Sequence, residues 1–330
     1  MPPITVVITS FNREKYIGAA IQSVLCSTFS DFQLLVLDDA STDGTLDVAR
    51  SYAQRDARLR VVANESNLGD YRNRNRAIDL VTTPFLKYHD SDDLIYPHCL
   101  GMMLQLLEGE LSAGFAMSSG RAWLGGPCPM FLSPRMAYLR EYLGPGMFSG
   151  GPSVALFRTE VLRGLGGFPE RGVASDYCFW LKACAVTSVV LVPGDLFWYR
   201  IHKGQEFQSE RAARDYAIGQ GESWRALHAP ECPLDGSTLD LAKRNCAYLL
   251  MKLTWRDLKA GRFGLARLRL QSAGLRPTDL VRYPPRRARD LLAGTPLTQD
   301  GEYLVPQWLQ HPNDRLADTA VDPVGTKPQR

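Results

Sequence analysis

Three aspartates fall within four residues, at Asp90, Asp92 and Asp93, directly after an apolar run over 83–88. An apolar run followed at once by carboxylates is typical of a buried strand whose last residues emerge at an edge of the sheet. Carboxylates this close repel one another, so they persist as anions only beside positive charge, and a hard divalent cation that also binds phosphate supplies it. A solvated acidic turn is the alternative, because so short a motif is weakly specific.

The elements that must position this cluster are visible in the first hundred residues, where strand-like and helix-like runs alternate. The pattern predicts strands over 4–8, 32–37, 59–62 and before Asp90, and helices over 14–27, 44–54 and 70–80. Such alternation indicates an α/β fold with a mostly parallel sheet. Ligands of open parallel sheets bind beyond the carboxyl ends of the strands. Residues 9–13, 38–39 and 90–93 should therefore converge on one crevice.

The rest of the chain is less regular and then becomes helical. Residues 101–150 are rich in Gly, Pro and Met, which suits either loops that line a cleft or an irregular surface connection. Around this stretch the pattern predicts helices over 97–108 and 159–165 and from Ser175, and strands over 154–157, 189–192 and 197–202. From about residue 211 the pattern is amphipathic and helical.

The composition is that of an ordinary globular protein, with 45% apolar residues, 22% charged residues and a net charge of +3 over 330 residues. Seven cysteines, with no CxxC or CxxH spacing, argue against a disulfide framework and a structural zinc site. No charged-then-apolar leader precedes Ile4, and no apolar run approaches the ~18 residues of a membrane span. These features favour a cytoplasmic protein.

Several ordered motifs resemble glycosyltransferase family 2, a family of inverting enzymes with the GT-A fold. The resemblance covers roughly residues 3–205, and the segments that carry it are 6–13, 37–45, 67–69, 74–77, 90–93, 175–180 and 199–202. It implies the GT-A nucleotide-diphospho-sugar transferase fold, in which a mostly parallel twisted sheet is flanked by helices. Here a helical C-terminal appendage would follow.

The resemblance implies a divalent cation, Mn²⁺ or Mg²⁺, at the crevice. Oxygen ligands suit either ion, and we expect Asp92 and Asp93 to hold it, with Asp90 in support. His202 would complete the metal site. Taken alone, His202 is more typical of a half-buried histidine on an aromatic strand.

The same resemblance implies a nucleotide-sugar donor carrying UDP, GDP or dTDP. The residues expected to bind this donor are Thr9, Phe11, Arg13, Asp39, Arg74 and Asp92. Phe11 would stack on the base, Asp39 would accept from the base or ribose, and Arg74 would meet the diphosphate. The alternatives are a helix-capping turn for Asp39, which Asp43 suits better, and a solvated helix face for Arg74.

The acceptor side of the reaction is implied by residues 150–180. Asp176 falls where the family keeps its catalytic base, which takes the proton of the acceptor hydroxyl. Ser175 stands where many members have Glu, and Asp176 could also serve as the N-cap of its helix. Gly150 and Gly151 resemble the loop on which the acceptor sugar approaches the backbone, and Trp180 belongs to the same side.

These motifs favour a metal-dependent inverting glycosyltransferase that moves a single sugar to an acceptor hydroxyl of a glycan or lipid-linked acceptor. The chain lacks the glutamine–x–x–arginine–tryptophan motif and the membrane spans of the processive branch. The alternatives are a catalytically silent sugar-nucleotide binding protein of the same fold and a nucleotidyltransferase. A nucleotidyltransferase is disfavoured because no glycine-rich, lysine-containing phosphate loop lies near the start.

We expect three regions along the chain: a GT-A domain over 1–210, a basic helical region over 211–315 and a disordered tail over 316–330. Basic residues dominate 243–289, where Asp257 and Asp279 are the only acids. This segment suits either peripheral contact with an anionic membrane at the inner face or a helical appendage that covers the core. We expect no nucleic-acid partner, because no recognition module is visible.

Overall fold

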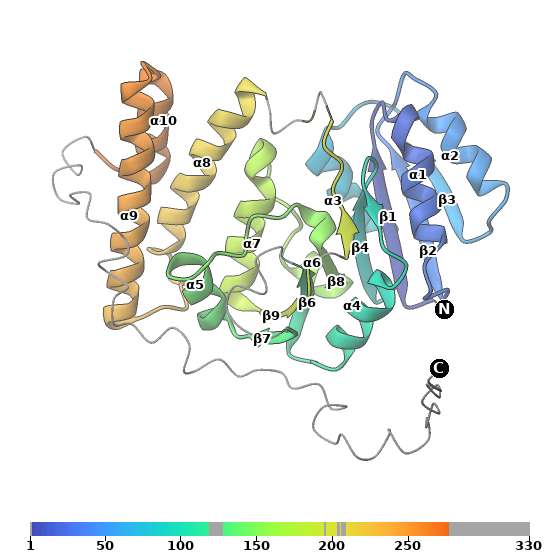
Figure 1. The fold of residues 1–330 in the computed structure, drawn as a ribbon, viewed down its shortest axis with the longest axis horizontal. Coiled ribbons are helices and arrows are strands. Elements are labelled where there is room, and N and C mark those ends of the chain that lie inside the picture. The colour runs from blue at the N-terminus through green and yellow to red at the C-terminus, as the bar shows by residue number, and fades with distance from the viewer. Residues whose placement is uncertain (1, 119–127, 195, 203–204, 206–208, 277–330) are drawn as a thin grey trace, which may run out of the picture.

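An eight-stranded mixed sheet forms the centre of the protein (Figure 1). The computed structural model describes residues 2–118, 128–194, 196–202, 205 and 209–276. The strand order is β3-β2-β1-β4-β8-β6-β9-β7. The strands are β1 (Ile4–Ser10), β2 (Phe32–Asp38), β3 (Leu59–Ala63), β4 (Phe85–Asp90), β6 (Ala113–Ser118), β7 (Met130–Leu132), β8 (Ala155–Arg158) and β9 (Ser188–Val192).

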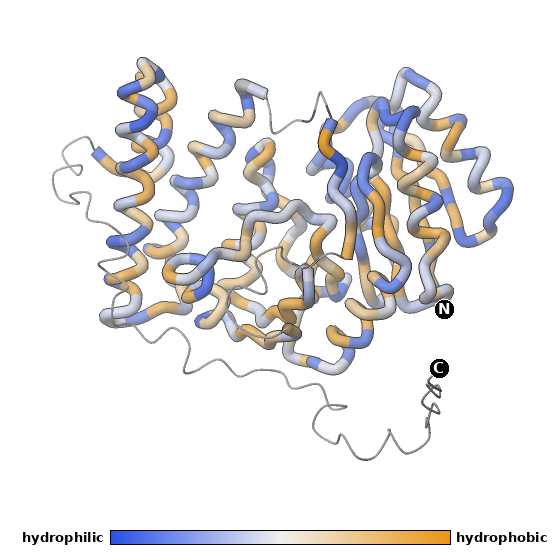
Figure 2. Tube along the Cα trace, viewed as in Figure 1, coloured by the Kyte–Doolittle hydropathy of each residue, from blue (hydrophilic) through white to orange (hydrophobic). Residues whose placement is uncertain are grey.

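The first half of the sheet is parallel, as the alternating pattern predicts. Strands β3, β2, β1 and β4 pair in parallel, and the helices α1 (Glu14–Leu25), α2 (Thr45–Ala53) and α3 (Asp70–Leu80) connect them. Every residue of β1 is buried, with Val7 in one hydrophobic cluster and Val6 and Ile8 in the other. A strand covered on both faces reads as a continuous apolar run, which is why it was visible in the sequence. Figure 2 shows this apolar interior along the strands.

The second half of the sheet contains antiparallel pairs that the sequence did not reveal. Strand β8 runs antiparallel to β4 and β6, and β7 runs antiparallel to β9. The strands β6 and β7 and the helix α5 (Pro134–Tyr142) lie inside the stretch 101–150 that we expected to be irregular. The expected strand over 197–202 is shorter: β10 (Phe197–Trp198) pairs with β5 (Leu94–Ile95) in a separate two-stranded ribbon. Residues 119–127, which include the glycines and proline at 125–127, lie outside the described residues.

Helices α4 (Cys99–Glu108), α6 (Thr159–Gly164) and α7 (Ser175–Val186) and the short 3₁₀ helices η1 (Pro152–Val154) and η2 (Gly172–Ala174) complete this part. Helix α7 buries Phe179 and Trp180, and the Trp180 ring stacks on Phe157 of β8 with centroids 5.7 Å apart. The segment that carries Asp176 is therefore anchored on the sheet.

The C-terminal part is helical, as predicted, and consists of α8 (Glu210–Ala226), α9 (Gly236–Lys259) and α10 (Phe263–Ala273). Figure 1 shows these helices beside α7, at the side opposite α2. Trp224 and Leu250 belong to the same hydrophobic cluster as Trp180, so α8 and α9 share the core of the sheet. The division at residue 210 stays a prediction, and the expectations for 277–315 and 316–330 lie outside the described residues. None of the helices in the described ranges is long and apolar enough to cross a membrane.

Candidate active site

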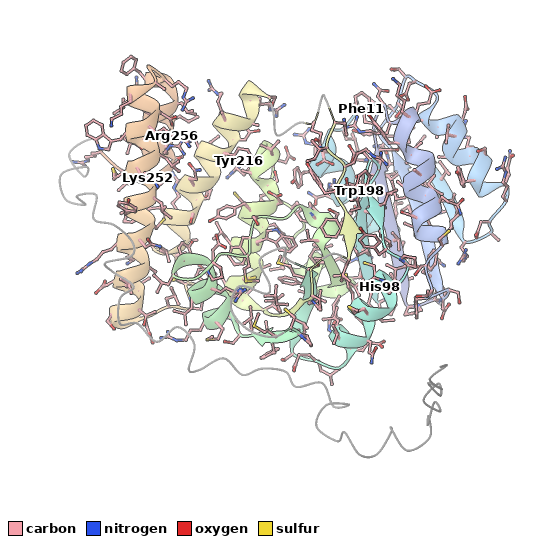
Figure 3. All side chains as sticks on the ribbon, viewed as in Figure 1. Phe11, His98, Trp198, Tyr216, Lys252 and Arg256 are labelled. Atoms are coloured by element: carbon pink, nitrogen blue, oxygen red, sulfur yellow. The ribbon has the colours of Figure 1, made fainter. Side chains whose placement is uncertain are left out.

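The carboxyl ends of β1, β2 and β4 lie side by side at one edge of the sheet. In the strand register Ser10 is paired with Asp38, and Thr9 is paired with Asp90. The predicted convergence of residues 9–13, 38–39 and 90–93 is therefore present in the fold. Phe11, with 42% of its surface exposed, lies just past the end of β1 and is labelled at this edge in Figure 3.

Asp92 joins two residues that are far apart in the sequence. Its Oδ2 lies 3.3 Å from Nε of Arg13 and 3.0 Å from Nε2 of His202. The His202 ring stacks on Tyr16 of α1 with centroids 4.8 Å apart, which fixes the ring plane. The backbone carbonyl of Asp92 accepts a hydrogen bond from Nε of Arg200 at 2.7 Å. The segment 200–202 is thus fastened over the end of β4.

Asp93 is buried, with 1% of its surface exposed. Its Oδ1 accepts a hydrogen bond from the Arg200 amide at 2.9 Å, whereas its Oδ2 has no hydrogen-bond partner among the described residues. Burial, together with the nearby Asp90 carboxylate, raises the pKa of Asp93 to about 7. A buried carboxylate oxygen without a donor is suited to a cation.

The predicted ligands Asp92, Asp93 and His202 do not form a preorganised metal site with three protein ligands. Asp92 and His202 are in contact, but the described residues contain no group of three His, Cys, Asp or Glu side chains placed to hold a metal ion. A hard cation such as Mg²⁺ takes one or two carboxylates from the protein and the remaining ligands from water and substrate phosphates. The donor set present here fits that mode of binding.

Arg74 lies beneath the acidic cluster and not on a solvated helix face, so that alternative is wrong. Its Nη2 lies 2.7 Å from Oδ1 of Asp90, and its Nε lies 2.9 Å from Oδ1 of Asp70. Burial alone would raise the pKa of Asp90, but Arg74 and the Ser153 hydroxyl outweigh it and hold the pKa below its usual value. The buried Nη1 of Arg74 has no hydrogen-bond partner among the described residues and is a donor available to a ligand.

Asp39 is buried, and its carboxylate is already hydrogen-bonded to other residues of the protein. Its carboxylate accepts hydrogen bonds from the amides of Leu68 and Gly69, at 2.9 and 2.8 Å, and from the side-chain amide of Asn64. Asp39 therefore shapes the loop before α3, where Gly69 has a φ of 87°. The turn before α2 is stabilised by Asp43, whose Oδ1 accepts a hydrogen bond from the Thr45 amide at 3.0 Å. A contact between Asp39 and the donor stays a prediction.

Asp176 lies in the first turn of α7 and is not its N-cap, a position that Ala174 occupies. Its Oδ1 accepts a hydrogen bond from the Tyr177 amide at 2.6 Å. Its Oδ2 lies on the side of Gly151, where a Cβ would be 3.9 Å from that oxygen. Burial raises the pKa of Asp176 to about 7, although the Tyr177 amide and Arg74 oppose the shift. A carboxyl with such a pKa can exchange a proton near neutral pH.

Gly151 lies beside Asp176, and Gly150 precedes it in the chain; their role on the acceptor side stays a prediction. Trp180 is fully buried, and its Nε1 donates a hydrogen bond to the carbonyl of Gly150 at 2.8 Å. Trp180 thus fixes the backbone of Gly150, and its assignment to the acceptor side stays a prediction. A side chain at position 151 would begin beside this carboxylate, because its Cβ would lie 3.9 Å from Oδ2 of Asp176 and 4.0 Å from the Ser153 hydroxyl.

Two residues that position the site were not among the candidates predicted from the sequence. Lys87 of β4 is buried and donates from Nζ to the carbonyls of Tyr88 and Ser153, so it ties η1 to the strand that carries Asp90. Asp215 of α8 accepts from the Val173 amide at 3.2 Å and holds η2, just before Asp176. Lys87 could have been singled out from the sequence, because it is a lysine within an apolar run. Nothing in the sequence around Asp215 indicates its role.

Solved structures with a similar arrangement identify the fold. Residues 1–349 of TarS from S. aureus, in complex with UDP-GlcNAc, superpose with a TM-score of 0.63 at 20% identity, over 88% of this chain and 83% of that one. The mannosyltransferase PcManGT from Pyrobaculum calidifontis, in complex with GDP-Man and Mn²⁺, superposes with a TM-score of 0.58 at 19% identity, over 88% and 79% of the two chains. The protein has the GT-A fold.

Sequence comparison identifies the family. Residues 5–165 match the model of Glycosyl transferase family 2. The Escherichia coli UDP-Glc:alpha-D-GlcNAc-diphosphoundecaprenol beta-1,3-glucosyltransferase WfgD is 32% identical over 104 residues, which are 32% of this chain and 40% of WfgD. Residues 5–165 therefore form a region of the glycosyltransferase family 2 type. The chain spans less than two thirds of the length of the first curated relatives that it matches.

Proposed function

We propose that this protein is a metal-dependent inverting glycosyltransferase that moves a single sugar from a nucleotide-sugar donor to an acceptor hydroxyl. The observation that carries the proposal is the position of Asp176: its carboxyl, with a pKa near 7, lies beside Gly151 and close enough to Arg74 and Asp90 for their charges to act on it. Inverting transfer needs one base, on the face of the sugar opposite the leaving group. In this role Asp176 accepts the proton of the acceptor hydroxyl as that oxygen attacks the anomeric carbon.

On the donor side, the cluster around Asp92 would hold the nucleoside diphosphate. Asp92, Asp93 and His202 would hold Mn²⁺ or Mg²⁺, which would supply positive charge to the leaving diphosphate. Nη1 of Arg74 and the guanidinium of Arg13 would donate to phosphate oxygens. Thr9 and the exposed ring of Phe11 would line the nucleoside side, with Asp39 beneath them.

On the acceptor side, Gly150 and Gly151 would let a sugar approach the backbone next to Asp176. We propose a glycan or lipid-linked acceptor and a cytoplasmic location, at the inner face of the membrane when the acceptor is lipid-linked. WfgD carries a diphosphoundecaprenol acceptor in its name, and it supports this class of acceptor by similarity only.

A thermal-shift screen of UDP-, GDP- and dTDP-sugars, with and without Mn²⁺, tests the donor side. A ligand that binds only the folded state stabilises it by about 2.7 kcal/mol at a concentration one hundred times its Kd. We expect one nucleotide class to raise Tm, and the metal to increase that shift. If no nucleotide sugar shifts Tm in the presence of metal, the proposal is wrong.

A further inference from the structure

The turn between α9 and α10 carries a cluster of exposed basic and aromatic side chains. Lys252, Trp255, Arg256 and Lys259 recur at intervals of three and four residues, so they form one stripe along the last two turns of α9. Phe263 and Arg267 are exposed on the first turns of α10. We call these six residues the hairpin tip.

The aromatic members of the hairpin tip are well exposed: 49% of Trp255 and 68% of Phe263 is accessible. Large aromatic side chains beside lysine and arginine are the composition of helices that lie at a membrane interface. There the rings sit at the level of the headgroups while the cations meet lipid phosphates.

Within residues 243–276, acidic side chains do not offset this charge. Asp257 is the only acid between residues 243 and 276. It is fully buried and lies 2.6 Å from Nη2 of Arg262 and 2.7 Å from Nη2 of Arg269. Asp240, near the start of α9, is sixteen residues from Arg256, or about 24 Å along the helix. That separation is well beyond the ~8 Å over which charges interact at physiological salt.

The hairpin tip and the site face the same edge of the molecule. Lys252 and Arg256 lie in the upper part of Figure 3, as does Phe11 at the end of β1. Helix α9 runs toward that edge and α10 runs back from it (Figure 1). A flat surface in contact with the hairpin tip would thus lie on the side to which the strands deliver Asp92 and its neighbours.

We propose that the hairpin tip docks the protein on an anionic lipid surface, with Trp255 and Phe263 at headgroup depth and the four cations on lipid phosphates. The binding itself is independent of the chemistry at Asp176. Its purpose, to bring the crevice to a lipid-linked acceptor, rests on the proposed function.

Co-sedimentation of the full chain with vesicles tests this docking. We expect binding to vesicles of phosphatidylglycerol and phosphatidylcholine and little binding to phosphatidylcholine alone. Each basic residue near an anionic surface contributes about fivefold in affinity, so Arg256→Glu with Lys259→Glu should weaken binding by about 25-fold or more. Trp255→Ala with Phe263→Ala should weaken binding at high salt, where the charges are screened.

The matched control is Arg50→Glu on α2 with Arg55→Glu in the turn just after it, which also changes the net charge from +3 to −1 and lies far from the hairpin tip. Equal loss of binding in both charge variants would overturn the proposal, because net charge alone would then explain it. Binding to RNA or DNA without binding to anionic vesicles would also overturn it. All variants should keep the donor-induced Tm shift. If the unaltered protein shows no donor-induced Tm shift, the proposed function is wrong, whereas the proposal of vesicle binding is unaffected.

Discussion

Replacing Asp176 by Asn should abolish most sugar transfer and spare donor binding. The change keeps the size of the side chain and an oxygen for the Tyr177 amide, but it removes the group that takes the proton. A positioned general base contributes about 10²–10⁴-fold, which corresponds to about 3–5 kcal/mol of activation free energy. We expect kcat to fall by that factor, while KM for the donor stays nearly constant because the proposed role of Asp176 is on the acceptor side.

The pH dependence of the unaltered protein follows from the same pKa. Only ionised Asp176 accepts a proton, so with a pKa near 7 the rate should be about one tenth of its plateau at pH 6 and about nine tenths at pH 8. An unfolded aspartate has a pKa of about 3.9, so the native state holds an extra proton between about pH 4 and pH 7. The stability contribution of Asp176 therefore falls as pH rises through that window and is constant above it.

Both effects can be measured on the same pair of proteins. Initial rates with labelled donor give kcat and its pH profile, and urea unfolding at several pH values gives the free energy of unfolding. The stability of Asp176→Asn relative to the unaltered protein should increase from pH 4 to pH 7. Asp47→Asn, at an exposed position on α2, is the matched control. Full activity of Asp176→Asn, or a rate that does not rise between pH 6 and pH 8, would refute the assignment.

Three further substitutions test the supporting geometry. Asp92→Asn should raise the Mn²⁺ concentration for half-maximal transfer by about tenfold or more, since even outer-shell changes cost about 10–100-fold in metal affinity; an unchanged Mn²⁺ titration would contradict its role. Gly172→Ala would place a Cβ 1.9 Å from Oδ2 of Asp215 at a φ of 57°, so it should destabilise the fold by about 1–3 kcal/mol and lower kcat, whereas Gly164→Ala, which meets nothing within 4 Å, should do neither. Asp39→Asn should cost about 1–3 kcal/mol in urea unfolding, because an amide nitrogen would replace one buried acceptor; unchanged stability would show that the loop before α3 does not depend on this carboxylate.

The sequence by itself determined the first half of the sheet and the edge at which the site forms. Strands such as 4–8 are buried on both faces and rich in β-branched residues, so their signal is local and strong. The rule that ligands bind beyond the carboxyl ends of parallel strands then predicts that Asp39 and Asp92 lie at the same edge of the sheet. The register of β1 with β2 and β4 confirms that placement.

Strand β6 shows what local sequence could not supply. Residues 113–118 contain Gly, Ser and two alanines and lack β-branched residues, so nothing in their sequence predicts a strand. They are extended because β8 and β9 pair with them on either side. Only tertiary contacts decide such an element, since its backbone partners lie more than 35 residues further along the chain.

Tertiary structure also decided the state of the charged groups in the site. The sequence motifs predict that Arg74, Asp90 and Asp176 belong to the site. The ion pair between Arg74 and Asp90 and the raised pKa of Asp176, however, depend on burial and on distances of a few ångströms. Electrostatic interactions vary steeply with distance and local dielectric, and neither can be read from spacing along the chain. The sequence therefore fixes which groups are present, whereas the packing of α3, β4 and α7 fixes which of them carry charge.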